Sequence, residues 1–187
     1  MRSALSALMT ALLLLTGCAG GPGVEGKLER QRDALRSCPE IRFQAEVTGA
    51  AGDRVFTCTL DCVSTPEETV LTVASPESIA GITARTAAGE TALSYDGVSL
   101  SLGASPGEDA PLSLLPTVAR CLRQGHILRA WRERDGEQSC AVADIYVGED
   151  RTLTVWFDGE ALTPLHAALT VDGERVSSCE IRDFRTE

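Results

Sequence analysis

Apolar and polar residues alternate one by one along most of this chain, and this alternation restricts the fold more than any other feature of the sequence. In the segment 55–63, for example, Phe56, Cys58 and Leu60 share one face of an extended chain. A period of two is typical of a β-strand with one buried face. Six segments show the pattern clearly and five show it weakly: 41–48, 55–63, 71–73, 98–102, 152–157 and 165–171, then 81–86, 92–95, 127–134, 140–147 and 175–184. The sequence therefore predicts a protein built mainly from strands.

Four Asp-Gly dipeptides separate predicted strands that are neighbours in the chain. They are Asp96-Gly97, Asp135-Gly136, Asp158-Gly159 and Asp172-Gly173. Asp-Gly tolerates the positive φ angles of a two-residue hairpin turn, so each dipeptide favours an antiparallel pair. The expected product is a large antiparallel meander rather than a parallel α/β sheet.

Two segments have helical periodicity. Residues 27–37 form the first predicted helix, because Leu28 and Leu35 are a heptad apart and charged residues fill the other faces. Residues 112–124 form the second, whose apolar stripe lies opposite Arg120 and Arg123: Leu115, Val118, Ala119 and Leu122. A lone helix set between two halves of a curved sheet is expected to pack across the concave face of that sheet.

The N-terminus has the features of an export signal. Arg2 supplies a positive charge, and the apolar run 4–15 is the right length for a signal peptide. That run is too short to span a bilayer, which takes roughly 20 apolar residues. A plain secretory peptide is one interpretation of these residues.

The stretch Leu15-Thr16-Gly17-Cys18 resembles the lipobox of bacterial lipoprotein precursors. The resemblance implies cleavage between Gly17 and Cys18 and a diacylglyceryl group on the Cys18 sulfur, with acyl chains such as palmitate. Two or three such chains hold a protein stably on a membrane. The expected location is the extracytoplasmic face of the cell membrane, with the polypeptide lipid-anchored.

These features predict a signal peptide over residues 1–17, a lipidated cysteine and flexible tether over residues 18–26, and a single domain over residues 27–187. The formal net charge of the chain is −10. Nucleic acids and anionic lipid surfaces select for basic patches, so an acidic domain disfavours both as partners. The acyl anchor is the expected contact with the membrane.

Six cysteines follow Cys18, and their role stays open between three alternatives. They are Cys38, Cys58, Cys62, Cys121, Cys140 and Cys179. An even number in an exported chain permits disulfides of unknown pairing. Cys58, Cys62 and Cys121 fall on apolar faces, which instead favours buried free thiols. Metal or redox chemistry is the third alternative, although the chain contains no C-x-x-C sequence.

The sequence predicts no enzyme, no metal site and no cofactor. It contains no G-x-S-x-G, H-E-x-x-H or phosphate-binding glycine loop. His126 and His166 are expected at the surface, and two histidines without a spacing pattern do not make a metal site. A cysteine paired in space with one of these histidines is an alternative that the sequence leaves open.

Several stretches together resemble the Lol-type lipoprotein carriers and receptors. They are Ala74-Ser75-Pro76-Glu77, Gly81-Ile82, Leu93-Ser94-Tyr95-Asp96-Gly97 and the helix start Pro111-Leu112-Ser113-Leu114-Leu115-Pro116. The resemblance implies an α+β, mainly antiparallel fold: a curved half-barrel meander with a short N-terminal helix and a mid-chain helix over the concave face. It also implies an apolar cavity that takes acyl chains of lipids or lipoproteins, and Cys18 resembles the anchored, receptor type.

The expected function is therefore non-catalytic binding or transfer of a hydrophobic ligand. Leu114, Leu115, Val118 and Leu122 are the predicted lid of the cavity, unless these four side chains simply fill a solid core. Arginines 120, 123, 129 and 132 are expected on solvated faces. The alternative function is a structural or assembly lipoprotein that docks an envelope protein partner.

Overall fold

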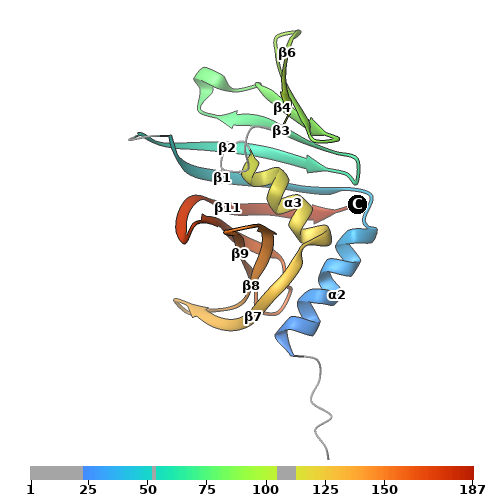
Figure 1. Cartoon of the computed structure of the whole chain (residues 1–187), viewed down its shortest axis with the longest axis vertical. Helices are drawn as coiled ribbons and strands as arrows, with labels where there is room; N and C mark the ends of the chain where they lie inside the picture. The colour runs from blue at the N-terminus through green and yellow to red at the C-terminus, as the bar shows by residue number, and fades with distance from the viewer. Residues whose placement is uncertain (1–22, 52–53, 105–112) are drawn as a thin grey trace, which may run out of the picture.

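The computed structural model describes residues 23–51, 54–104 and 113–187, which form one eleven-stranded antiparallel sheet and two α-helices (Figure 1). The predicted signal peptide and the cleavage site at Gly17 and Cys18 lie outside the described residues. Those predictions, and the division into domains, stay predictions.

All the predicted strands are present in the described part of the chain. They are β1 (Ile41–Ala51), β2 (Arg54–Ser64), β3 (Glu68–Ser75), β4 (Thr83–Ala87), β5 (Glu90–Tyr95), β6 (Val98–Ala104), β7 (His126–Asp135), β8 (Gln138–Gly148), β9 (Arg151–Asp158), β10 (Pro164–Val171) and β11 (Glu174–Thr186). A short 3-10 turn, η1 (Glu77–Ile79), follows β3.

The sheet consists of two meanders joined at their first and last strands. Its order is β6-β5-β4-β3-β2-β1-β11-β10-β9-β8-β7, so β1 pairs with β11 and the middle of the chain lies at the two edges. The register Ala45↔Ile181 and Val47↔Cys179 places apolar side chains of both strands on one face. The sheet curves strongly and does not close, which confirms the predicted half-barrel (Figure 1).

The first helix, α2 (Val24–Ser37), begins three residues before the predicted start at residue 27. The tether predicted over 18–26 is therefore wrong for its last residues. Gly23 precedes the helix, and its carbonyl accepts the Lys27 N–H at 3.1 Å, which closes the first turn. An isolated glycine such as Gly26 is tolerated inside a helix at a cost of about 1 kcal/mol. The buried Leu28 and Leu35 form its inner side, as predicted.

The second helix, α3 (Leu114–Gln124), crosses the concave face between the two meanders (Figure 1). It connects edge strand β6 to the opposite edge strand β7, and it packs against α2, β2, β3 and β8. Pro116 lies in its first turn, where a missing N–H leaves no bond unmade. The predicted position of the mid-chain helix is confirmed.

Two of the four Asp-Gly dipeptides form the predicted two-residue turns. Asp96-Gly97 and Asp172-Gly173 have positive φ at both residues, as a primed hairpin turn requires. Between β7 and β8 the turn residues are Gly136 and Glu137, one position later than predicted, because Asp135 still pairs with Gln138. At Asp158-Gly159 the expected two-residue turn is wrong, because the connection between β9 and β10 runs over residues 159–163. There the Asp158 carboxylate accepts the backbone N–H groups of Glu160 and Ala161.

Candidate functional site

The concave face has a covered half, made by β1, β2 and β7–β11 under the two helices. All four predicted lid residues are buried there in one core cluster: Leu114, Leu115, Val118 and Leu122. The cavity that reaches Leu122 between the helices and the sheet holds only about 20 Å³. That is about the room of a single water molecule, so this cavity is too small for an acyl chain.

Arg123 is the side chain that ties α3 to its neighbours. Although the sequence predicts it on a solvated face, Arg123 is only 6% exposed. It donates to the carbonyls of Leu35 (3.0 Å), Cys38 (2.6 Å) and Ser64 (2.8 Å). Burial lowers the pKa of this guanidinium, but arginine stays charged in proteins. The buried cation therefore binds the C-terminal end of α2 and the end of β2.

Two arginines of α2 make the reciprocal contacts. Arg32 donates to the Gly125 carbonyl at 3.2 Å, and Arg36 donates to the Arg123 carbonyl at 3.4 Å. The last carbonyls of a helix have no partner within the helix and carry a partial negative charge. Each helix thus supplies arginines to the C-terminal end of the other, and this clamp holds α3 over the covered half.

The other half of the concave face, over β4–β6, is open. Its register aligns Leu71, Ala84, Leu93 and Leu100 in one row, so β5 and β6 continue the apolar face of the core. At the far strands this face is exposed: Tyr95 by 55%, Val98 by 71%, Leu100 by 60% and Leu102 by 40%. A contiguous exposed apolar surface of this kind marks a binding site more often than isolated apolar residues do.

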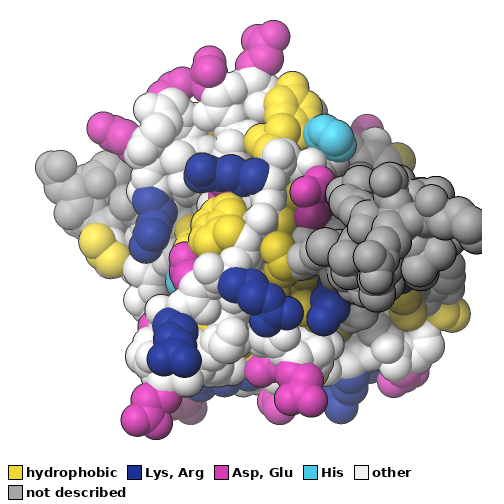
Figure 2. Space-filling model, turned by 90° about the horizontal axis from the view of Figure 1, so that it is seen from below, with side chains coloured by type: hydrophobic (Ala, Val, Ile, Leu, Met, Phe, Trp, Pro, Cys, Tyr) yellow, Lys and Arg dark blue, Asp and Glu magenta, His cyan; other side chains and the backbone are white. Residues whose placement is uncertain are grey.

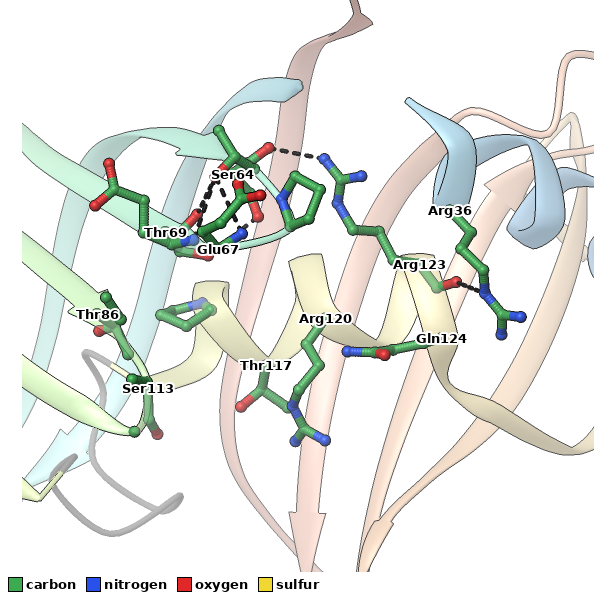
Figure 3. Close-up of a pocket in the computed structure, with 17 residues that line it drawn as sticks. Arg36, Ser64, Glu67, Thr69, Thr86, Ser113, Thr117, Arg120, Arg123 and Gln124 are labelled. Carbon is green, nitrogen blue, oxygen red and sulfur yellow. Dashed lines mark hydrogen bonds between the residues drawn. The ribbon is translucent and has the colours of Figure 1, made fainter. Parts of the chain in front are cut away.

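A pocket of about 390 Å³ lies where α3 meets the open half (Figure 3). Its walls come from the β2–β3 and β4–β5 connections and from the first turns of α3. Arg120, Thr117 and Gln124 extend from α3 along one side of it, and Thr86 and Thr69 lie on the strands opposite (Figure 3). One hydroxyl pair lines it, Ser64 with Thr69 at 3.0 Å, and the lining Thr86 hydroxyl bonds that of Thr91 at 3.1 Å. The pocket is therefore the polar end of an otherwise apolar face.

The structure describes the six cysteines from Cys38 to Cys179 as free thiols. Burial raises the pKa of the Cys62 thiol well above its usual range and that of Cys179 to about 12. Burial, with nearby carboxylates, also raises the pKa of Cys140, which lies in one depression with His166. A nucleophilic cysteine needs a lowered pKa, so this arrangement does not suit a Cys–His pair.

On the convex face, a network of polar and aromatic side chains covers β7–β11. The Trp131 indole donates to one Glu133 carboxylate oxygen at 2.9 Å, and the Trp156 indole donates to the other. His166, predicted at the surface, is half-buried and bonds the Glu180 carboxylate at 2.7 Å. Seen from the β7 side, basic side chains lie scattered among apolar and acidic ones (Figure 2). Arg129 and Arg132 are both exposed, as predicted.

Within the described ranges 23–51, 54–104 and 113–187, no three or more histidine, cysteine or acidic side chains are grouped so that they could hold a metal ion. Neither described α-helix has the length and apolar character that crossing a membrane requires.

Comparison with known proteins gives matches at the level of structure only. No protein-family model matches the chain, and no curated protein matches it. An uncharacterized conserved protein from Thermus thermophilus matches with a TM-score of 0.51 at 10% identity, over 88% of each chain. A domain described as an outer membrane lipoprotein-sorting protein, from Vibrio parahaemolyticus, matches with a TM-score of 0.50 at 12% identity, over 88% of this chain and 94% of that one. Identities this low establish the fold alone, and the predicted Lol-type fold is confirmed.

Proposed function

We propose that this chain is an extracytoplasmic lipoprotein, anchored to the membrane through acyl chains on Cys18, that binds a hydrophobic ligand without catalysing a reaction. The single observation that carries the proposal is the exposed apolar surface on the concave side of β4–β6. The lipobox at residues 15–18 supports the anchor. The Lol-type fold is compatible with both parts of the proposal.

An acyl chain fits this surface for a simple energetic reason. Each methylene that leaves water for an apolar surface contributes about 0.8 kcal/mol. Leu102 precedes Gly103, which pairs with Thr91 near the start of β5, and the β4–β5 turn just before β5 lines the 390 Å³ pocket. The open face therefore leads toward this pocket. A ligand with its chain along β5 and β6 places its polar end in this pocket, beside Arg120 and the threonine hydroxyls.

The cavity predicted beneath Leu114, Leu115, Val118 and Leu122 is a separate question. A ligand there requires α3 to move away from the core and to break the Arg123 contacts with Leu35, Cys38 and Ser64. The open half needs no such movement. The proposal therefore places the first contact of the ligand on β4–β6, and the space under α3 stays a prediction.

Native mass spectrometry of an exported, unacylated Cys18→Ala chain tests the proposal, followed by lipid extraction of what is bound. We expect co-purifying acyl species that are reduced about tenfold or more by Leu100→Asp, because a buried charge against the chain is costly. Leu128→Asp is the matched control, since Leu128 is 51% exposed at the opposite edge of the sheet. An apo mass with no uptake of added fatty acid or lipopeptide contradicts the proposal and favours the assembly lipoprotein that docks an envelope protein.

A further inference from the structure

The two edges of the sheet differ in how they are protected. Among the described residues, the sheet ends at β7 on one side and at β6 on the other. Strand β7 is charged at Arg129, Arg132, Glu133 and Arg134, its register shifts between Ile127 and Arg129, and α2 packs against it. Charges and bulges are the usual means by which an edge strand avoids pairing with another chain. The β7 edge is therefore protected.

Among the described residues, none of these protections is found along the regular part of the β6 edge, Val98 to Ser101. Its sequence from Val98 to Leu102 is Val-Ser-Leu-Ser-Leu, with no charged residue and no proline, and all five residues are exposed. The pairing with β5 is regular up to Ser101, and Gly103, with φ of +74°, follows the shift in register. An uncharged, alternating, regular edge is a template for a further strand.

The turn before β6 determines which backbone groups face outward. In a two-residue hairpin the residues that flank the turn exchange both hydrogen bonds, so Tyr95 and Val98 are such a pair. Hydrogen-bonded pairs alternate along the ladder, and the next one is Leu93 with Leu100. The backbone N–H and C=O of Ser99 and Ser101 therefore point away from β5, toward the free edge.

We propose that a second copy of this chain pairs with this edge, β6 against β6 and antiparallel, with the two-fold axis at Leu100. In this register Ser99 of one copy exchanges backbone hydrogen bonds with Ser101 of the other. Leu100 then lies opposite Leu100, and Val98 lies opposite Leu102. The palindromic pattern Val-Ser-Leu-Ser-Leu thus matches apolar residues with apolar residues and serine with serine, as an isologous interface requires.

Charge restricts where a second copy can meet this chain. The chain carries a formal charge of −10, so two copies repel one another over most of their surfaces. The β6 edge is a place where they meet without like charges, because Asp96 of one copy lies opposite position 104 of the other. A partner of opposite charge finds no charged side chain to bind between Val98 and Leu102.

Edge pairing takes place within the plane of the sheet and leaves its faces accessible. The two-fold axis is perpendicular to the sheet, so both concave faces open on the same side and their apolar surfaces join along β6. The inference does not depend on a ligand, and it remains testable if the proposed lipid binding fails.

Cysteine crosslinking of the full chain in cell membranes tests the register. A non-hydrogen-bonded antiparallel pair has a Cα–Cα distance of about 4.5 Å, which is suitable for a disulfide. We expect Leu100→Cys to give a disulfide-linked dimer on mild oxidation. Ser99→Cys alone should give little disulfide-linked dimer. When Ser99→Cys and Ser101→Cys are carried by separate, co-expressed copies, the two copies should crosslink. The wild-type chain and Leu128→Cys, at the β7 edge, control for the native cysteines.

A proline on the same edge tests whether the pairing drives association. Ser99→Pro removes an N–H that faces the free edge and leaves the backbone hydrogen bonds with β5 intact, although it also removes the bond from the Ser99 hydroxyl to the Leu93 carbonyl. Co-purification of a second, differently tagged copy should fall about tenfold or more, while Ser99→Thr keeps it. Fluorescence of Trp131 and Trp156, far from β6, reports whether each variant folds.

Absence of a Leu100→Cys dimer, or equal crosslinking at Leu128→Cys, overturns the proposal. Undiminished co-purification of a folded Ser99→Pro variant overturns it as well. If Ser99→Pro fails to fold, the crosslinking pattern decides alone. Loss of acyl binding without loss of crosslinking would count against the proposed function and leave the dimer in place.

Discussion

The covered and open halves of the concave face carry the same sequence pattern and end in opposite environments. On β9, Leu153 and Val155 alternate with polar residues and are fully buried. On β6, Leu100 and Leu102 alternate in the same way and are 60% and 40% exposed. The difference lies in what covers each half, since α2 and α3 pack over the first and not over β6. Alternation therefore identifies the apolar face of a strand but not whether that face is buried.

The largest expected difference between the halves concerns leucine truncation. Leu115→Ala removes a fully buried side chain of the covered half, and we expect the free energy of unfolding to fall by about 2–5 kcal/mol. Leu100→Ala in the open half should change it by less than about 0.5 kcal/mol, because most of that side chain is already in water. Urea denaturation of both variants makes the comparison. Equal losses would show that the open half is covered in solution.

Removing the Arg123 side chain should cause the second-largest loss in the free energy of unfolding. Arg123→Ala leaves the carbonyls of Leu35, Cys38 and Ser64 without this donor, and an unsatisfied buried group costs about 1–3 kcal/mol. We expect a loss of about 2–3 kcal/mol, because water can enter to satisfy some of these groups.

Arg120→Ala is the matched control, one turn earlier on the exposed side of α3, with an expected change within about 0.5 kcal/mol. Chemical denaturation followed by far-UV circular dichroism measures both variants. A stable Arg123→Ala protein would mean that packing alone holds α3 over the covered half.

The smallest expected effect is a change in melting temperature when the aspartate of one Asp-Gly dipeptide from each half is replaced. The Asp158 carboxylate accepts backbone N–H groups of Glu160 and Ala161, and these bonds lower the pKa of Asp158. A lowered pKa in the folded state stabilises the protein above the unfolded pKa of about 3.9, and the contribution disappears as pH falls through the folded value.

Asp158→Asn should therefore lower the melting temperature slightly at pH 7, and the difference from the wild type should shrink as the pH falls below about 3.9. Asp96→Asn, in the open half, keeps a residue that tolerates the positive φ of its turn, so its melting temperature should stay close to that of the wild type. Thermal melts over this pH range measure both. A pH-independent difference for Asp158→Asn would contradict the carboxylate's role.

Local patterns predicted most of the fold and little of the site. The strands, the helix α3 and two hairpin turns follow from periodicity and from Asp-Gly chemistry, which act over a few residues, and a third turn lies one residue from its predicted place. The start of α2 was misplaced because Gly26 suggested a break that the turn closed by Gly23 and Lys27 does not need. Arg123 was misplaced because its three acceptors lie on two other elements.

The sequence-based prediction placed the hydrophobic site at the apolar side of α3 and not on the open apolar face of β4–β6. The sequence nevertheless contains a signal for that face. The segment Val98–Leu102 contains no charge on either face, which is unusual for a strand with one side in water. That signal does not say whether a helix covers the strand. Only the path of α3, away from β6 and toward α2, shows that Leu100 stays exposed.

The sequence by itself determined which segments form strands, which form helices, where two of the hairpins turn and which side of each strand is apolar. Those properties depend on backbone preferences and side-chain periods within a few residues. Only the tertiary structure decided that β1 pairs with β11, that α3 buries one half of the concave face, and that β6 is an edge strand of the described sheet. Each of these depends on contacts between residues far apart in the chain, such as Arg123 with Leu35, and no local pattern encodes such a contact.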